Sequence, residues 1–495
     1  MGARDPVQVL RSIVGADHVL VDADVRAGYE VDWTGRWRGR ALAVVRPGST
    51  EEVAAIVAAC AAAGVAVLPQ GGNTGLVGGG APAGGEVVLS LRRLTRVGDV
   101  DPLSNQVTVG AGVVLADLQA ALEPGGRELA IDLAARDSAT IGGLVATNAG
   151  GLRVLRHGTM RAQVVGLEAV LADGTVVSRL AGLAKDATGY DLSSLLVGSE
   201  GTLGVVTAAR LRLVPRRPAR VTALLALASV ADAVSVAATL RDRLDSLDVA
   251  ELVVGPTLAL VAQQRNLASP FTEPPVAALL VECGARTEAP VEALAEAVLA
   301  SGPLVLDVAV GDQPTARARL WQLREEITDA LQAAGPPRKL DVSLPLDRLA
   351  AFADDVVAQV GSGHPGAACH LFGHVLDGNL HVNVLGVDDA DGEAVDELVL
   401  GLVATAGGSI GAEHGIGRAK VRWLHLSRSP AELAAFRAIK AALDPAGTLS
   451  PGVLLPGSGS GSGPADLDPA GHGPGPGPAD AGTGPSDPVR PTPSS

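Results

Sequence analysis

Short apolar runs alternate with segments of helical periodicity along the first part of the chain. Residues 41–46 form an apolar run typical of a buried strand, and Ser49 with Glu52 has the spacing of a capping box, which predicts a helix through residue 63. Residues 65–68 predict the next strand. Further strand-like runs at residues 86–91, 106–109 and 164–171 indicate an α/β or α+β domain that ends near residue 217.

The pattern changes after residue 217. Alanine and leucine then recur with helical spacing to about residue 400, which predicts a second domain that covers a bound ligand. From residue 457 onward glycine, serine and proline dominate, and such a segment cannot offset its ordering entropy by burial. We expect domains at residues 1–217 and 218–456 and a disordered tail at residues 457–495, since one core rarely organises 495 residues.

Composition and charge exclude several classes of partner. The net charge of −15 repels a phosphate backbone and only 2% of the residues are aromatic, so nucleic-acid binding is not expected. Cys60, Cys283 and Cys369 lie far apart in the sequence, which argues against disulfides and a thiolate metal site. We find neither a signal-peptide pattern nor the roughly 20 apolar residues of a membrane span, and we expect a cytoplasmic protein without an integral membrane segment.

Glycine-rich loops are the first candidate for a binding function. Residues 70–75 (Gln-Gly-Gly-Asn-Thr-Gly) follow a predicted strand, where glycines let backbone N–H groups approach a pyrophosphate. The loop lacks the Lys-Ser/Thr pair of an ATPase P-loop, and a structural turn is the alternative interpretation. Three further loops, at residues 137–143, 147–151 and 198–204, would line a long groove together with the first.

In these loops and in residues 185–191 (Lys-Asp-Ala-Thr-Gly-Tyr-Asp), the chain resembles the FAD-linked oxidases of the vanillyl-alcohol oxidase and PCMH-type superfamily. The resemblance implies an α+β fold, with a PCMH-type FAD-binding domain of two subdomains and an α+β substrate domain with an antiparallel sheet, whose last residues return to the flavin domain. It also implies non-covalent FAD, because no histidine stands in the first loop. The implied FAD contacts are Gln70, Gly71, Gly72, Asn73, Thr74, Gly75, Ser138, Gly142, Gly143, Asn148, Gly150, Gly201 and Thr202.

A histidine-containing hairpin is predicted at residues 373–383. If Asp377-Gly378 is a two-residue turn, His374 and His381 face each other across the hairpin with Cβ atoms ~5 Å apart, and Asn383 lies on the same face. Two such imidazoles suit a divalent metal that takes one more ligand. Glu413 is the candidate for that ligand. Histidines that merely stabilise the hairpin are the alternative, and His370 is a less favoured ligand.

The hairpin and residues 413–417 (Glu-His-Gly-Ile-Gly) resemble the same superfamily's C-terminal domain. The resemblance implies that His374, His381 and Glu413 bind a divalent metal, Zn²⁺ before Mn²⁺ or Fe²⁺, and that His414 is the catalytic base. The metal would bind the substrate's hydroxyl and carboxylate, His414 would take the hydroxyl proton, and hydride would pass to the flavin. Leu376 departs from the family's usual glycine, which leaves metal occupancy open.

Arg324 and Thr328 are four residues apart in a predicted helix over residues 321–328, and Lys339 follows in a predicted strand. A solvated helix face is the alternative. These segments resemble the D-2-hydroxyglutarate dehydrogenase branch, which implies that the three residues hold the distal carboxylate of a D-2-hydroxy acid substrate. We expect Asn383 and His414 to contact the substrate as well. The resemblance covers about residues 5–456.

Several alternatives stay open at this stage. D-lactate or glycolate would serve the same mechanism, and a metal-dependent hydrolase or a non-catalytic flavin-binding subunit are interpretations of other classes. We expect an electron acceptor such as an electron-transfer flavoprotein or a quinone, and the sequence also leaves oxygen open. A homodimer is one oligomeric state that the sequence leaves open.

Overall fold

The first sheet has a parallel centre, as the strand-helix-strand pattern predicts. The computed structural model describes residues 5–388 and 390–457. The sheet has the order β1 (Val19–Leu20), β2 (Ala43–Val45), β4 (Val87–Ser90) and β3 (Val67–Gln70), with β1 antiparallel and the others parallel. Helices α1 (Pro6–Val14) and α3 (Thr50–Ala63) pack on it. The Ser49 hydroxyl accepts the Glu52 N–H at 3.3 Å, which starts α3 where the sequence predicts.

A second, antiparallel sheet completes the N-terminal half. Its order is β5 (Gln106–Gly110), β9 (Val205–Arg212), β7 (Val164–Val170) and β8 (Val176–Arg179), and α4 (Leu115–Leu122) and α5 (Ile141–Thr147) share its core. Side chains from both sheets form one hydrophobic core. Smaller elements are α2 (Ala23–Arg26), β6 (Arg127–Glu128), α6 (Val154–His157), α7 (Met160–Gln163), α8 (Leu192–Leu196) and β10 (Val214–Pro215).

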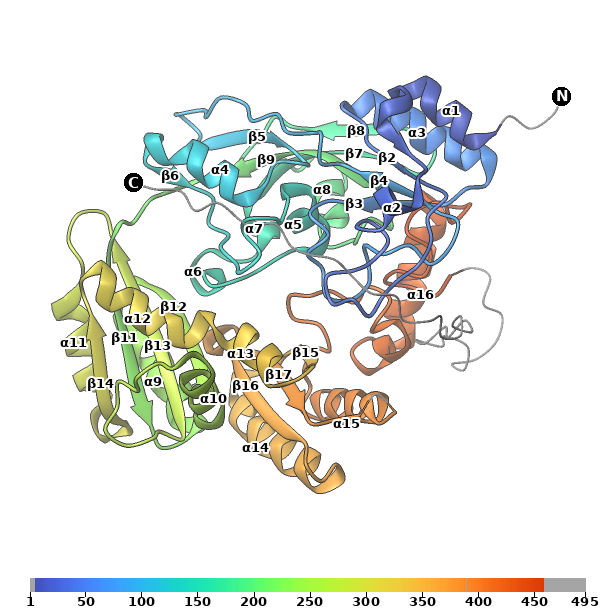
Figure 1. Cartoon of the computed structure of the whole chain (residues 1–495). Helices are drawn as coiled ribbons and strands as arrows, with labels where there is room; N and C mark the ends of the chain where they lie inside the picture. Colours follow the sequence, from blue (N-terminus) through green and yellow to red (C-terminus); the bar gives the residue numbers. More distant parts are fainter. Residues whose placement is uncertain (1–4, 389, 458–495) are drawn as a thin grey trace, which may run out of the picture. The chain divides into compact units, whose positions relative to one another are not determined.

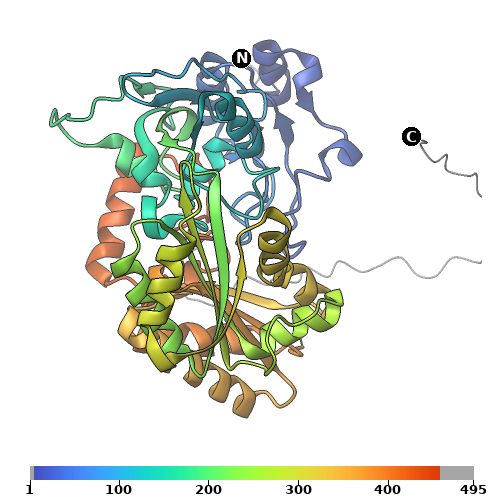
Figure 2. The ribbon, with the colours of Figure 1, turned by 90° about the vertical axis from the view of Figure 1, so that its left-hand side faces the viewer.

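The second domain is built on a seven-stranded antiparallel sheet (Figures 1 and 2). Its order is β14 (Val305–Gly311), β11 (Ala219–Leu227), β13 (Ala277–Ala285), β12 (Leu247–Val254), β16 (Ala368–His374), β17 (Asn379–Leu385) and β15 (Arg338–Ser343). One face packs on α9 (Val230–Arg243), α11 (Val291–Ala300), α14 (Leu346–Gly363) and α15 (Gly392–Thr405), and the other on α10 (Gly255–Arg265), α12 (Pro314–Glu325) and α13 (Ile327–Ala334). The predicted α+β class with an antiparallel sheet is confirmed.

The chain passes between the domains twice. The first passage follows β10, and the second lies between Ser409, which pairs with Ser343 of β15, and Arg418, whose N–H donates to the Val77 carbonyl. After α16 (Pro430–Leu443), the chain pairs beside β3, and Leu449 is buried in the core of the N-terminal sheets. Residues 458–495, most of the tail for which we predict disorder, lie outside the described residues.

Two exclusions made from the sequence can be compared with the described residues. All three cysteines are free in the structure. Among residues 5–388 and 390–457, no helix combines the length and the apolar character that crossing a membrane requires.

His157, at the end of α6, makes stability depend on pH. Burial, followed by the positive charges of Arg156 and Arg153, lowers the pKa of His157 from 6.5 to about 4. The unfolded chain binds the proton more readily, so the stability from neutral His157 is complete above the unfolded pKa and is lost as the pH falls through the window between these values. Urea unfolding measures the free energy of unfolding at about pH 7.5 and about pH 5. The decrease between these two pH values should be smaller in His157→Gln than in the wild type, by on the order of 1 kcal/mol. An equal loss in both proteins would contradict this.

Candidate active site

Two histidines and a glutamate of the second domain converge on one point. His374 ends β16, His381 lies in β17, and Glu413 lies in the loop after α15. A nitrogen of each imidazole and an oxygen of the carboxylate all lie within 4.8 Å of one another. The two rings meet edge to face, with centroids 5.7 Å apart. This spacing suits three ligands of one divalent cation.

A buried carboxylate orients each of the two histidines. Nδ1 of His374 is hydrogen-bonded to Glu251 of β12, and Nδ1 of His381 lies 3.2 Å from Asp341 of β15. Nε2 of His374 lies 3.6 Å from the Glu413 carboxylate. Carboxylates in such positions fix the tautomer and orientation of metal-binding histidines. Burial opposes the charged ring, but Glu251 and Glu413 raise the pKa of His374 well above its usual value, so the site stabilises positive charge.

The hairpin that carries the histidines differs from the predicted one. His381 pairs with Phe372 and not with His374. β16 ends at His374, and Val375–Asp377 form a 3₁₀ turn, so the predicted two-residue Asp-Gly turn and its register are wrong. The turn is stabilised by burial, because its first residue is fully buried and Leu376 packs against the same core. The two imidazoles still lie on one face, as the metal hypothesis requires.

Asp341 holds the loop of Glu413 and His414 in place. Its buried carboxylate accepts the backbone N–H groups of Glu413 at 2.7 Å and His414 at 2.9 Å, and the side-chain amide of Asn379 at 2.8 Å. Burial opposes ionisation, but His414 and His381 keep the pKa of Asp341 well below its usual value. Asp341, His381 and His414 are also close enough to hold a metal. The hydrogen bonds already made by Asp341 make that set the less suitable one.

His414 lies beside the cluster and is the candidate base. Its ring stacks on His381, with centroids 5.7 Å apart, and its Nδ1 lies 4.0 Å from Asp341. Burial lowers the pKa of His414, and Asp341 counters the shift only in part. The ring is therefore neutral near pH 7 and able to accept a proton.

The helix predicted over residues 321–328 is interrupted at Glu326. α12 ends just before this residue and α13 begins just after it, because Glu326 has a ψ angle of −1°, outside regular helical geometry. Arg324 and Thr328 therefore lie in two helices, and the predicted single helix is wrong.

Arg324 is held in place by Glu251 and Phe372. Its Nε donates to Glu251 at 2.6 Å, and its guanidinium lies 4.6 Å from the centroid of the Phe372 ring. The two terminal nitrogens have no hydrogen-bond partner among the described residues. They are the donors with which arginine binds a carboxylate in bidentate fashion.

Lys339 and Asn383 are direct neighbours across β15 and β17. The Lys339 ammonium lies 5.0 Å from the centroid of the Trp33 ring, which belongs to the N-terminal half of the chain. Asn383 is 4% exposed, and its amide bonds to no other described residue. Thr328 is partly buried, and its hydroxyl also has no partner in the described part of the chain. With Arg324, four predicted substrate residues thus have polar groups without a hydrogen-bond partner in the described part of the chain.

The first glycine loop packs too closely for side chains at Gly71 and Gly72. A Cβ atom on Gly71 would lie 2.2 Å from the Thr140 hydroxyl, and one on Gly72 would lie 2.1 Å from the Ser138 carbonyl oxygen. The Thr140 hydroxyl is buried and lacks a partner among the residues described. A cavity of about 320 Å³ adjoins these loops and is lined by Trp33, Gly72, Asn73, Thr74, Ala134, Ala135, Asp137 and Ser138. Such a backbone-lined cavity fits the phosphate-bearing part of a dinucleotide.

Other predicted cofactor residues shape the loops with their side chains. Backbone groups of neighbouring segments bond at 2.8–2.9 Å to Gln70, Asn73 and Asn148, and the Thr202 hydroxyl donates at 2.6 Å to the Ser199 carbonyl of its own loop. Contacts with a cofactor from these residues, and from the backbone of Gly75, Gly142, Gly143, Gly150 and Gly201, stay a prediction.

Loops of the N-terminal half reach the histidine cluster. The Gly151 N–H donates to Glu413 at 2.6 Å, and a Cβ atom on Gly150 would lie 2.6 Å from the same carboxylate oxygen. Glu200 accepts the N–H groups of Ile416 at 2.9 Å and Gly417 at 2.7 Å. The Glu-His-Gly-Ile-Gly loop is therefore held by both halves of the chain.

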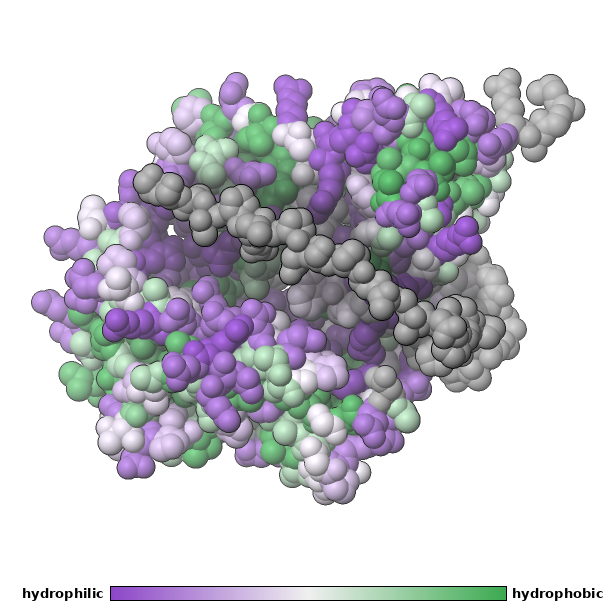
Figure 3. Space-filling view, viewed as in Figure 1, coloured by the Kyte–Doolittle hydropathy of each residue, from purple (hydrophilic) through white to green (hydrophobic). Residues whose placement is uncertain are grey.

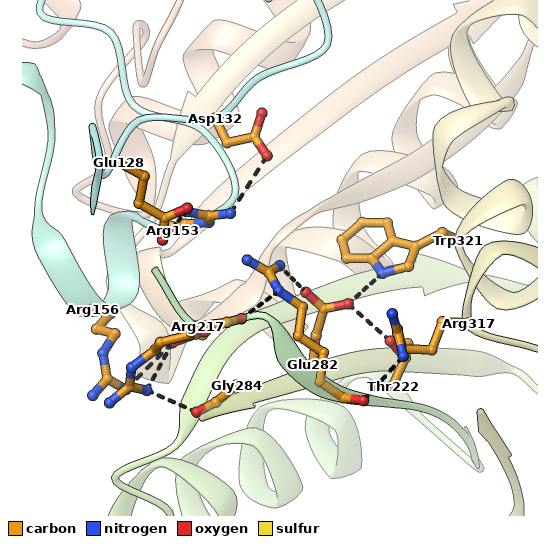
Figure 4. Close-up of polar contacts among 12 residues, drawn as sticks. Glu128, Asp132, Arg153, Arg156, Arg217, Thr222, Glu282, Gly284, Arg317 and Trp321 are labelled. Carbon is orange, nitrogen blue, oxygen red and sulfur yellow. Dashed lines mark hydrogen bonds and ion pairs between the residues drawn. The ribbon is translucent and has the colours of Figure 1, made fainter. Parts of the chain in front are cut away.

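A network of arginine–carboxylate pairs lies on the face of the seven-stranded sheet that also carries the candidate site (Figure 4). Arg153 pairs with Glu128 at 2.9 Å, and Glu282 of β13 accepts from Arg220 at 2.5 Å and from the Trp321 indole at 2.8 Å. The network borders a second cavity of about 320 Å³. Figure 3 shows hydrophilic surface in this region, between the N-terminal loops and α12. Arg156 of the first domain lies 3.4 Å from the Asp248 carboxylate of β12, and this ion pair ties the second domain to the first.

Comparison with known proteins identifies the family. Residues 216–454 match the family described as FAD linked oxidases, C-terminal domain, and residues 41–179 match the FAD binding domain. The mitochondrial D-2-hydroxyglutarate dehydrogenase of Bos taurus is 40% identical over an alignment that covers 92% of this chain and 84% of the relative. The D-2-hydroxyglutarate dehydrogenase of Xanthomonas citri pv. viticola is 41% identical, with 86% and 92% covered. This chain belongs to the D-2-hydroxyglutarate dehydrogenase family.

Solved structures confirm the PCMH-type fold of this D-2-hydroxyglutarate dehydrogenase family member. The crystal structure of p-cresol methylhydroxylase with substrate bound has a TM-score of 0.72, with 19% identity, and covers 91% of this chain and 96% of that one. A 4-ethylphenol oxidase from Gulosibacter chungangensis has a TM-score of 0.70 at 20% identity, with 91% and 97% covered. The FAD binding domain match also confirms the predicted FAD.

Sequence reasoning missed three residues of the site in this family member. Asp341 lies two positions after Lys339 on one strand, so strand periodicity already placed both on one face. Glu251 is one of two acids, with Asp248, in the otherwise apolar strand β12, and a charge in such a run indicates a paired group. Trp33 carries no local signal, because its contact with Lys339 forms only in the folded chain.

Proposed function

We propose that this protein oxidises D-2-hydroxyglutarate to 2-oxoglutarate, with FAD as the first electron acceptor. One observation carries the proposal: two cationic side chains with unused donors, Arg324 and Lys339, border the His414 cluster. The chain that carries them is 40% identical to a D-2-hydroxyglutarate dehydrogenase. A second, distal carboxylate on the substrate requires positive charge beside the cluster, which Arg324 and Lys339 supply. D-lactate and glycolate lack a distal carboxylate and would not use these cations.

His414 acts as the base in this proposal. Its Nδ1 faces Asp341, so Nε2 is the nitrogen that accepts the proton of the substrate hydroxyl. Asp341 orients the loop through two backbone N–H groups and stabilises the charge that His414 gains. Arg324, Thr328 and Lys339 bind the distal carboxylate.

The residues present fit both cofactors. FAD is to be held by the glycine loops, where packing at Gly71 and Gly72 leaves no room for a side chain, and it would supply the two-electron acceptor. His374, His381 and Glu413 are to hold a divalent metal, Zn²⁺ before Mn²⁺ or Fe²⁺, which favours the deprotonated substrate hydroxyl. An electron-transfer flavoprotein or a quinone is the proposed acceptor of electrons from the flavin, in a cytoplasmic enzyme.

Arg324→Gln tests the substrate assignment. Glutamine keeps a donor for Glu251 and removes the bidentate grip, so we expect KM for D-2-hydroxyglutarate to rise about 10- to 100-fold in anaerobic flavin reduction. KM for D-lactate should change much less. Arg348→Ala, an exposed arginine on α14, is the matched control. Failure of the wild-type flavin to bleach with D-2-hydroxyglutarate would refute the proposed function, and equal losses for both substrates would refute the role of Arg324.

A further inference from the structure

Three polar side chains form one row across the seven-stranded sheet of the second domain. Lys339 of β15 pairs with Asn383 of β17, and Asn383 pairs on its other side with His370 of β16. Directly paired residues of antiparallel strands project from the same face, with Cβ atoms ~5 Å apart. His370 therefore lies on the face that carries two of the proposed substrate residues.

The polar groups of this row lack partners. Asn383 and His370 are 4% and 8% exposed, and the buried Nδ1 of His370 has no hydrogen-bond partner among the described residues. The Asn383 amide and the Lys339 ammonium form no hydrogen bond or ion pair in the described part of the chain, although Lys339 contacts the Trp33 ring. Buried polar groups are nearly always paired in folded proteins, so each exception requires an explanation. A row of three such groups indicates a polar ligand.

The row lies between the arginine and the flavin-domain loops. Phe372, two residues after His370 on the same face of β16, carries the Arg324 guanidinium over its ring at 4.6 Å. At the other end of the row, Lys339 lies over Trp33, which lines the cavity beside the glycine loops. His370 thus lies on the same face of the sheet as Lys339 and the Phe372 ring that carries Arg324, the two cations of the proposed distal-carboxylate site.

We propose that His370 is a further substrate-binding residue, which donates a hydrogen bond to the distal carboxylate of the dicarboxylate bound by Arg324 and Lys339. The inference rests on the proposed function and names a specificity residue for it. A neutral imidazole supplies one N–H donor, and burial, which lowers the pKa of His370, favours that form. An acid without a distal carboxylate makes no use of this donor.

The test compares His370→Phe with His370→Asn. Phenylalanine fills the space and removes the donor, whereas the asparagine amide supplies one in its place. We expect His370→Phe to raise KM for D-2-hydroxyglutarate about 10- to 100-fold, with a small change in kcat, and His370→Asn to restore most of the loss. For D-lactate, His370→Phe should have much less effect. His364→Phe, at the end of α14 and outside the row, controls for the added ring.

Binding of glutarate, an unreactive dicarboxylate, separates this proposal from the proposed function. Glutarate should perturb the flavin absorbance of the oxidised holoenzyme, and His370→Phe should raise its Kd by the same factor. If the wild type binds glutarate in this way but does not oxidise D-2-hydroxyglutarate, the proposed function fails while the role of His370 stands. Equal losses for D-lactate and D-2-hydroxyglutarate, unchanged kinetics, or absence of glutarate binding to the wild type would each overturn the role of His370.

Discussion

Replacement of His414 by alanine is expected to slow reduction of the flavin by D-2-hydroxyglutarate about 100- to 10,000-fold, which is the usual contribution of a general base. His414 lies against His381 and is oriented by Asp341, and among the described residues no other histidine lies as close to both. Stopped-flow reduction under anaerobic conditions measures the rate at saturating substrate. Flavin and metal content should stay close to those of the wild type, because His414 belongs to neither proposed ligand set.

His425→Ala is the matched control for this prediction. His425 is exposed, and its Nδ1 bonds only to the carbonyl of Arg422 within its own turn. Its loss should leave the reduction rate unchanged. A His414→Ala rate within a factor of about three of the wild type would contradict the assignment of the base, since proton transfer to a residue in this position contributes far more.

Asp341→Ala is expected to destabilise the protein by about 3–5 kcal/mol, which is typical when one partner of a buried charge network is removed. The carboxylate is fully enclosed and bonds to the loop of Glu413 and His414, to Asn379 and to His381. Its loss leaves these donors buried without an acceptor. We also expect bound metal to fall, because His381 loses the group that orients its ring.

Urea unfolding and metal analysis of the purified holoenzyme test this prediction. Asp341→Asn keeps the volume and one acceptor, so it should lie between the wild type and Asp341→Ala. Asp347→Ala removes an exposed carboxylate from the start of α14 and should stay within about 0.5 kcal/mol of the wild type. A loss for Asp341→Ala no larger than that of this control would show that the carboxylate is not structural.

Local patterns predicted the elements of the flavin domain well. The Ser49 cap, helix α3 and the strands β2 to β5 and β7 follow from capping chemistry and from apolar runs, which act over a few residues. The antiparallel sheet of the second domain followed from the family resemblance and not from periodicity, because several of its strands carry apolar residues on both faces and are separated by long helices. Such strands resemble buried helix segments in composition.

The errors at the candidate site have a common cause. The Asp-Gly turn and the continuous helix over residues 321–328 were both inferred from short-range rules. The structure replaces them with a 3₁₀ turn that packs Leu376 on the core and with a break at Glu326, which pairs with Arg265 of α10 at 2.9 Å. Both changes depend on contacts that are distant in sequence. These errors do not change which residues come together, because the fold still places four predicted residues near one another: His374, His381, Glu413 and Arg324.

The double passage of the chain between the domains restricts how the second domain can move. A lid on a single linker can swing in many directions, but a body attached at two places opens only about the line through both attachments. The second attachment, between Ser409 and Arg418, contains Glu413 and His414 themselves. Glu413 and His414 are therefore joined through the backbone to both halves of the chain, so movement of one half against the other is restricted most directly at these two residues.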